Sequence, residues 1–107
     1  MVEKQILNIV RKYLASLPDY GIHPTFGVIF GSFARGTTNN WSDLDVVVIA
    51  PEFDNNPILP LWKKLWHATK GMDNRIEPIP CGVKEWREGS PQSIIETARK
   101  EGIEITL

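Results

Sequence analysis

Cysteine is scarce in this chain, and the long apolar runs of membrane proteins are missing. The 107 residues contain one cysteine, Cys81, which excludes an intrachain disulfide and fits a reducing compartment. No apolar stretch approaches the roughly 20 residues that span a bilayer. The first residues, MVEKQILNIV, place charges within an apolar pattern and so differ from a signal peptide. We therefore expect a cytoplasmic protein that makes no use of a membrane.

An excess of charge of either sign is also lacking. Twelve basic and 13 acidic residues leave a formal net charge of −1, which gives no basis for bulk electrostatic attraction to nucleic acid. The two histidines, His23 and His67, have no further ligands at metal-binding spacing. With 107 residues and 42% hydrophobic content, residues 1–107 are expected to form a single domain.

Hydrophobic periodicity divides the chain into alternating helices and strands. Apolar residues at helical spacing predict helices over 2–17 and from 58 to near Gly71, and a Ser-Pro start predicts another from Ser90 to Gly102. Short apolar or alternating runs predict strands at 25–30, 43–50, 74–79 and 103–107, with a short helix starting at Ser32. Segments 51–57 and 80–90 are expected to be connecting loops. This order predicts an α/β (α+β) fold in which a small mixed β-sheet packs against helices.

Two carboxylates stand at the start of the second predicted strand. Strand side chains alternate between faces, so Asp43 and Asp45 share one face, about 7 Å apart along the strand. Nearby carboxylates raise each other's pKa unless a cation separates them. Because Mg²⁺ prefers carboxylate oxygens together with substrate phosphates, the pair predicts a magnesium site.

A Gly-Ser turn ends the strand before this pair. Gly31 has no side chain, so a ligand can approach its backbone closely. A helix starting at Ser32 would offer unpaired N–H groups and a hydroxyl to a phosphate. Taken alone, a Gly-Ser turn or an Asp-x-Asp strand end is usually structural. Their combination predicts that the loop holds a triphosphate while the next strand holds its metal.

The stretch GSFARGTTNNWSDLDVVV, residues 31–48, resembles the signature of the minimal nucleotidyltransferase domain of the DNA polymerase β-like superfamily. Gly-Ser, Ala-Arg-Gly, a short spacer, Ser-Asp-x-Asp and an apolar strand all occur in the order of that signature. The resemblance implies a nucleotidyltransferase-like fold. It also implies transfer of a nucleoside monophosphate, with ATP as the expected donor, to a hydroxyl acceptor and release of pyrophosphate.

The resemblance assigns roles to individual residues. Gly31 and Ser32 would hold the triphosphate, and Asp43 and Asp45 would bind two Mg²⁺ ions. Arg35 matches the arginine of the signature, where it either contacts phosphate or braces the loop.

A third carboxylate usually joins the metal site from a later strand. Glu77, in RIEPIP, is the candidate, although the family more often has Asp and Pro78 follows it directly. Asp73 is the alternative if that strand begins earlier.

The acceptor and the partner stay open. Small members of the family are often paired with a helical-bundle partner of the HEPN class, which implies an antitoxin that transfers AMP to that partner. A homo-oligomer is the alternative to that partner, and a small hydroxylated molecule or an RNA end is the alternative acceptor.

The competing interpretation is a module of the same fold that binds a nucleotide or a partner without turnover. A polymerase fragment is disfavoured by the near-neutral charge. Trp41 either stacks on a base or covers the loop.

Overall fold

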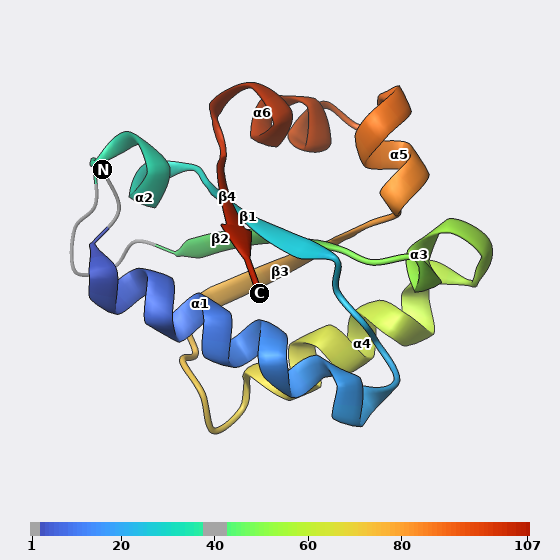
Figure 1. The fold of residues 1–107 in the computed structure, drawn as a ribbon, viewed down its shortest axis with the longest axis horizontal. Helices are drawn as coiled ribbons and strands as arrows, with labels where there is room; N and C mark the ends of the chain where they lie inside the picture. Colours follow the sequence, from blue (N-terminus) through green and yellow to red (C-terminus); the bar gives the residue numbers. More distant parts are fainter. Residues whose placement is uncertain (1–2, 38–42) are drawn as a thin grey trace.

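A four-stranded mixed sheet forms the centre of the protein (Figure 1). The computed structural model describes residues 3–37 and 43–107. The strand order is β3-β2-β1-β4, with β1 antiparallel to both of its neighbours and β2 parallel to β3. The strands are β1 (Phe26–Phe30), β2 (Leu44–Ile49), β3 (Ile76–Cys81) and β4 (Ile103–Thr106). The predicted mixed sheet packed against helices is confirmed.

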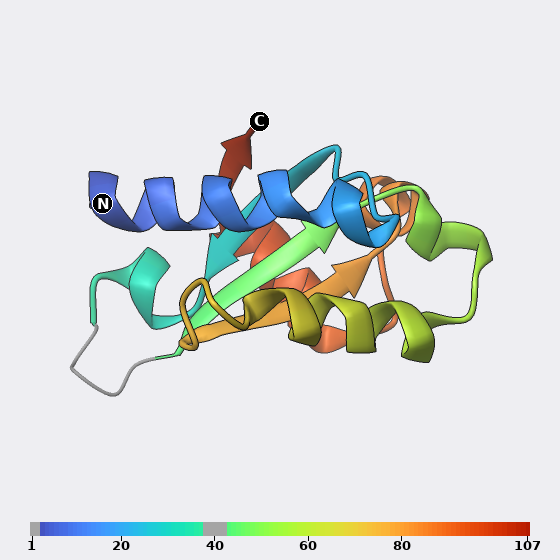
Figure 2. The same ribbon diagram turned by 90° about the horizontal axis from the view of Figure 1, so that it is seen from below.

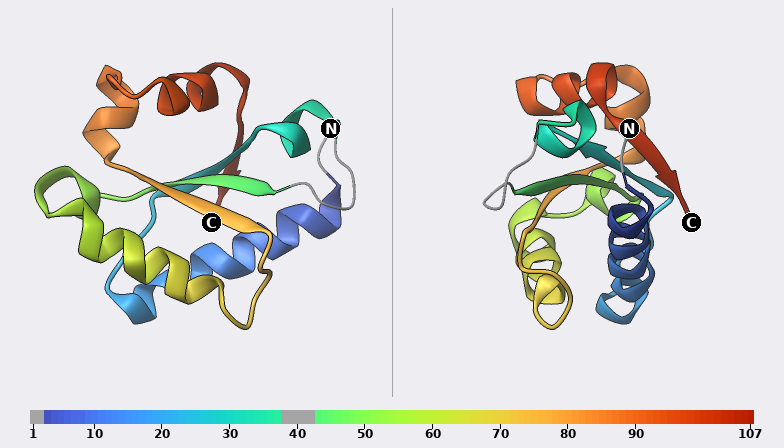
Figure 3. Two further views of the ribbon diagram at one scale, coloured as in Figure 1. Left: turned by 180° about the vertical axis from the view of Figure 1, so that it is seen from behind. Right: turned by 90° about the vertical axis from the view of Figure 1, so that its left-hand side faces the viewer.

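Helices cover both faces of this sheet. They are α1 (Lys4–Ser16), the 3₁₀-helix η1 (Leu17–Tyr20), α2 (Ser32–Arg35), α3 (Glu52–Asn55), α4 (Ile58–Thr69), α5 (Val83–Glu88) and α6 (Ser93–Glu101). Helices α1 and α4 lie on one face, whereas α5 and α6 lie on the other (Figure 3). The view from below shows α1 and α4 extending across the sheet (Figure 2).

The central strand β2 is buried on both faces, which explains its unbroken apolar run. Val46 and Val48 pack in the core on the α1/α4 side, and Val47 and Ile49 pack in the core on the α5/α6 side. Because side chains alternate along a strand, Asp45 projects to the same side as Val47, toward the α5/α6 layer.

Strand β3 accommodates two prolines because it lies at the edge of the sheet. Pro78 and Pro80 are both buried, and each lacks the N–H that an inner strand would need for its neighbour. The indole Nε1 of Trp62 donates to the carbonyl oxygen of Pro78 at 2.9 Å. A side chain of α4 therefore supplies a hydrogen bond to a backbone carbonyl group on the outer edge of β3.

Several predicted boundaries are wrong. The expected loops at 51–57 and 80–90 contain helices α3 and α5, and β3 begins at Ile76 and continues to Cys81. The last helix starts at Ser93 rather than Ser90, because Ser90 accepts and donates hydrogen bonds in the preceding turn instead of capping the helix. Strand β2 begins at Leu44, which leaves Asp43 just outside it. The predicted helical residue Val2 lies outside the described residues.

No helix in the described ranges combines the length and the apolar character that crossing a membrane would require.

Candidate functional site

Strand register brings the predicted site residues to one end of the sheet. Phe30, the last residue of β1, is paired with Asp45, and Asp45 is paired in turn with Glu77 on β3. Paired residues on neighbouring strands lie about 5 Å apart. Gly31, Asp45 and Glu77 therefore come from three successive strands but meet at the same place, with Asp43 exposed two residues before Asp45.

Gly31 lies directly against the Asp45 carboxylate. Its φ of +74° and ψ of −149° fall in a region that essentially only glycine adopts. A Cβ placed on Gly31 would overlap Oδ2 of Asp45. Two features therefore require glycine at this position: the backbone conformation and the close approach of the Asp45 carboxylate. Ser32, half-buried, opens the single turn of α2 immediately after it.

The three carboxylates influence one another's protonation. Burial is the main cause that raises the pKa of Asp45, and the charge of Asp43 raises it further. The pKa of Glu77 is raised in the same way, first by burial and then by the charges of Asp43 and Asp45. The register that pairs Asp45 with Glu77 explains why each of these carboxyl groups affects the pKa of the other. The site therefore concentrates negative charge.

This donor set suits a hard divalent cation, since carboxylate oxygens are preferred ligands of Mg²⁺ and a cation would relieve the repulsion. Within residues 3–37 and 43–107, however, no three His, Cys, Asp or Glu side chains are already arranged to hold one ion together. Asp45 and Glu77 fit the ion by chemistry and position, and joint coordination with Asp43 requires side-chain rotation.

Arg35, the last residue of α2, forms an ion pair with α6. Its Nη1 lies 3.6 Å from Oε2 of Glu101, at the C-terminal end of α6, and both side chains are about half exposed. The positive charge of Arg35 also lowers the pKa of Asp45, although less than burial and Asp43 raise it. Of the two roles predicted for Arg35, the bracing of the loop is the one for which the structure contains a partner, Glu101.

Asp73, the alternative third carboxylate, is engaged elsewhere. It precedes β3 and accepts hydrogen bonds from the backbone and guanidinium of Arg75, the shortest at 2.7 Å from Nη2. These bonds hold the pKa of Asp73 below its ordinary value. Arg75 also lies over the ring of Phe33 on α2, 5.7 Å from its centroid. Asp73 thus helps to support α2 rather than joining the carboxylates.

Sequence reasoning missed the two braces of α2, which are Glu101 and the Arg75–Phe33 contact. Neither has a local signal, because each partner lies far along the chain from α2. Two residues named from the sequence lie outside the described residues: Trp41, for which the sequence left base stacking and covering of the loop open, and Ser42, which belongs to the signature.

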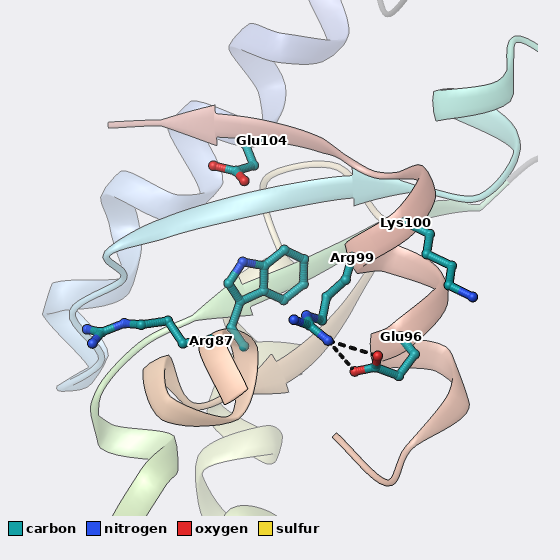
Figure 4. Close-up of a pocket in the computed structure, with 6 residues that line it drawn as sticks. Arg87, Glu96, Arg99, Lys100 and Glu104 are labelled. Carbon is teal, nitrogen blue, oxygen red and sulfur yellow. Dashed lines mark hydrogen bonds and ion pairs between the residues drawn. The ribbon is translucent and has the colours of Figure 1, made fainter. Parts of the chain in front are cut away.

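A separate hollow lies between α5, α6 and β4 (Figure 4). Its lining residues are Trp86, Arg87, Glu96, Arg99, Lys100 and Glu104. Within it the Glu96 carboxylate accepts two hydrogen bonds from Nη1 of Arg99, at 2.8 and 2.9 Å. None of the predicted site residues lines this hollow, so it is distinct from the carboxylate site.

Comparison with known proteins bears on the family and the fold of the chain. A family model described as a nucleotidyltransferase domain matches residues 5–104. Among solved structures, a proposed nucleotidyltransferase from Sulfolobus solfataricus has 15% sequence identity and a TM-score of 0.65, covering 94% of this chain and 78% of that one.

A second similar structure is that of a toxin–antitoxin with AMP-PNP, at 20% identity and a TM-score of 0.63, covering 92% of this chain and 71% of that one. Among curated proteins, none matches. The two structural similarities support the fold, and the family model extends over nearly the whole chain. The chain therefore belongs to the nucleotidyltransferase domain family, within the DNA polymerase β-like superfamily.

Proposed function

We propose that residues 1–107 form a single magnesium-dependent nucleotidyltransferase domain that moves AMP from ATP to a hydroxyl acceptor. The observation that carries this proposal is the meeting of Gly31, Asp45 and Glu77 at one end of the sheet, where burial and mutual repulsion raise the pKa of both carboxyl groups. A site that concentrates negative charge beside an open glycine backbone is suited to a nucleotide carried with a divalent cation.

Each residue has a proposed role. Gly31 and Ser32 bind the triphosphate through backbone N–H groups and the serine hydroxyl. Asp43, Asp45 and Glu77 would hold Mg²⁺, which supplies charge neutralisation and orientation at the phosphates. The acceptor oxygen forms a bond to the α-phosphorus, the bond from the α-phosphorus to the bridging oxygen breaks, and pyrophosphate leaves. Glu77, as the third carboxylate of the proposed site, would accept the hydroxyl proton.

We further propose that the acceptor belongs to a protein partner of the HEPN helical-bundle class and that the chain acts as its antitoxin. The similarity to a structure of a toxin–antitoxin with AMP-PNP supports this.

A module that binds nucleotide without turnover is the second candidate. One observation favours it: among the described residues, the three carboxylates are not arranged to coordinate one metal ion together.

Turnover and binding are separated by one set of reactions. The protein is incubated with Mg²⁺, α-³²P-labelled ATP and a purified HEPN-type helical-bundle protein, and pyrophosphate release and protein labelling are measured. We expect both signals, with their loss in Asp43→Asn and Asp45→Asn. Asp19→Asn, on the exposed turn η1, is the matched control and should retain them. Nucleotide binding without release in the wild type would instead establish the non-catalytic module.

A further inference from the structure

The two helices that cover one face of the sheet carry only positive charge. Lys4, Arg11 and Lys12 lie on α1, Lys63 and Lys64 lie on α4, and neither helix contains an acidic residue. The whole chain has a net charge of −1, so its acids are concentrated on other surfaces. Among ion pairs within the described ranges, none involves a lysine of α4.

Helix α4 presents an ordered line of side chains on this basic layer. Leu59, Lys63 and Trp66 recur every three or four residues and therefore share one side of the helix, and Lys70, the residue directly after α4, continues this spacing. We call these four residues the α4 stripe. Leu59 is 64% exposed and Trp66 is 44% exposed, whereas the opposite side of α4 is buried against the core.

Exposed apolar surface is concentrated here. Six large hydrophobic residues are exposed within the described parts of the chain, and four of them lie on α4 or in the turn that follows it, namely Ile58, Leu59, Trp66 and Met72. Single exposed apolar residues need no explanation, but a group of them bordered by lysines is typical of an interaction surface. A hollow lined by residues 69–75 continues from the C-terminal end of the stripe.

The neighbouring sheet edge cannot accept an added strand. Pro78 and Pro80 remove two N–H donors from β3, and the carbonyl oxygen of Pro78 already accepts a bond from Trp62. A partner that approaches this side therefore has side chains of α4 to bind, and little free backbone. This favours a helix as the occupant.

We propose that the α4 stripe docks an amphipathic helix of a second protein, one whose apolar ridge is flanked by Glu and Asp residues. Leu59 and Trp66 would pack against the ridge, and Lys63 and Lys70 would pair with the acids. Aliphatic Leu59 and Ile58 fit a protein helix better than a phosphate backbone, which recruits cations and aromatic groups. The inference rests on the proposed function only in that this function calls for a protein partner.

The stripe and the carboxylates share one end of the sheet but not one face. Helix α4 ends at Thr69, and residues 70–75 lead directly into β3, whose second residue is Glu77. Asp45 and Glu77 project toward the α5/α6 layer, so a helix bound along the stripe would anchor the partner from the opposite layer.

The test is selection of a phage-displayed library of helical peptides on the intact protein. We expect enriched peptides to carry acids beside apolar residues at helical spacing, and to bind Lys63→Glu/Lys70→Glu at least about tenfold more weakly than wild type. The control Lys84→Glu/Lys100→Glu makes the same charge change on the opposite layer and should bind as wild type. Trp66→Ala should weaken binding, whereas Ile94→Ala, which removes a residue of similar exposure on α6, should not. Circular dichroism verifies folding of each variant.

Several results would overturn docking. These are no enriched peptide, peptides that bind the stripe variants and wild type equally, or binding through Lys63 and Lys70 of poly-uridylate RNA or phosphatidylglycerol vesicles in place of peptides. Asp43→Asn separates this inference from the proposed activity, because it should abolish AMP transfer while leaving peptide binding unchanged.

Discussion

Gly31 and Asp45 are in contact through a space that only glycine leaves open. The backbone of Gly31 has φ +74°, and any Cβ there would overlap the Asp45 carboxylate. The residue that begins the proposed phosphate turn is thereby fixed against the central carboxylate of the proposed metal site, which joins the two halves of the sequence signature physically. A methyl group added at residue 31 would therefore both strain the backbone and overlap the Asp45 carboxylate.

Gly31→Ala should therefore destabilise the protein and weaken nucleotide binding. We expect a loss of about 1–3 kcal/mol in the free energy of unfolding, because the alanine adopts a strained backbone and displaces Asp45. Gly36→Ala is the control, since Gly36 has φ +75° but nothing within 4 Å of the place its methyl group would take. It should lose only the backbone strain of about 1–2 kcal/mol and bind nucleotide normally. Urea unfolding and a fluorescent ATP analogue measure the two effects, and equal binding losses in both variants would contradict the proposed contact.

Asp45→Asn should raise stability at neutral pH while abolishing nucleotide transfer. Burial and Asp43 raise the pKa of Asp45 in the folded protein, so the unfolded chain ionises more readily and stability is lost as pH rises through the ordinary range of an aspartate. The amide removes this penalty, and its benefit should decline as pH falls through about 4 and disappear below about pH 3, where the carboxyl group is protonated in both states.

Asp73→Asn should have the opposite effect on stability and destabilise the protein at neutral pH. Hydrogen bonds from Arg75 lower the pKa of Asp73, so its contribution to stability is present above the ordinary aspartate range and is lost on acidification. Thermal unfolding of both variants at pH 7 and pH 4 distinguishes the two cases. A common sign for both variants would refute the assignment of Asp45 as the repelled carboxylate.

The strands and the site residues could be predicted largely because their signals are local. The apolar run of β2 and the flanking Gly31 and Asp45 lie within a single short stretch, and the edge position that tolerates Pro78 also places Glu77 beside Asp45. Helices α3 and α5 could not be predicted, because each is stabilised by the other. The Asp54 carboxylate on α3 accepts the N–H of Lys84 at the start of α5, at 3.2 and 3.3 Å, from 30 residues away.

The braces of α2 escaped prediction for the same reason. Glu101 and Arg75 reach α2 only once the chain has folded, and neither spacing nor composition reports such pairs. The engagement of Asp73 with Arg75 is local, but it competes with the extended strand that would have placed Asp73 near the site. Geometry within a turn, rather than residue type, engages Asp73 with Arg75 and leaves Glu77 as the proposed third carboxylate.

Arg35→Ala and Glu101→Gln should differ in their effects on nucleotide binding. The ion pair between them is exposed, so its loss alone is worth about 0–1 kcal/mol of stability. In the phosphate-contact role that the sequence signature also allows, the guanidinium of Arg35 would pair with the triphosphate, and its removal should weaken binding of Mg²⁺-ATP by about tenfold, or 1.4 kcal/mol. Isothermal titration calorimetry with each variant measures this. A binding loss in Glu101→Gln as large as in Arg35→Ala would mean that Arg35 acts only as a brace.

Trp62→Phe should destabilise the protein by about 0.5–1.5 kcal/mol, because it removes the indole N–H that satisfies the carbonyl oxygen of Pro78 on the outer edge of β3. Phenylalanine keeps most of the apolar contact of the half-buried ring, so the lost hydrogen bond dominates. Trp66→Phe, four residues later on the exposed side of α4, is the matched control and should change stability by no more than about 0.5 kcal/mol. Chemical unfolding followed by far-ultraviolet circular dichroism avoids the altered fluorescence of either variant. Equal losses in the two would show that the edge carbonyl does not depend on Trp62.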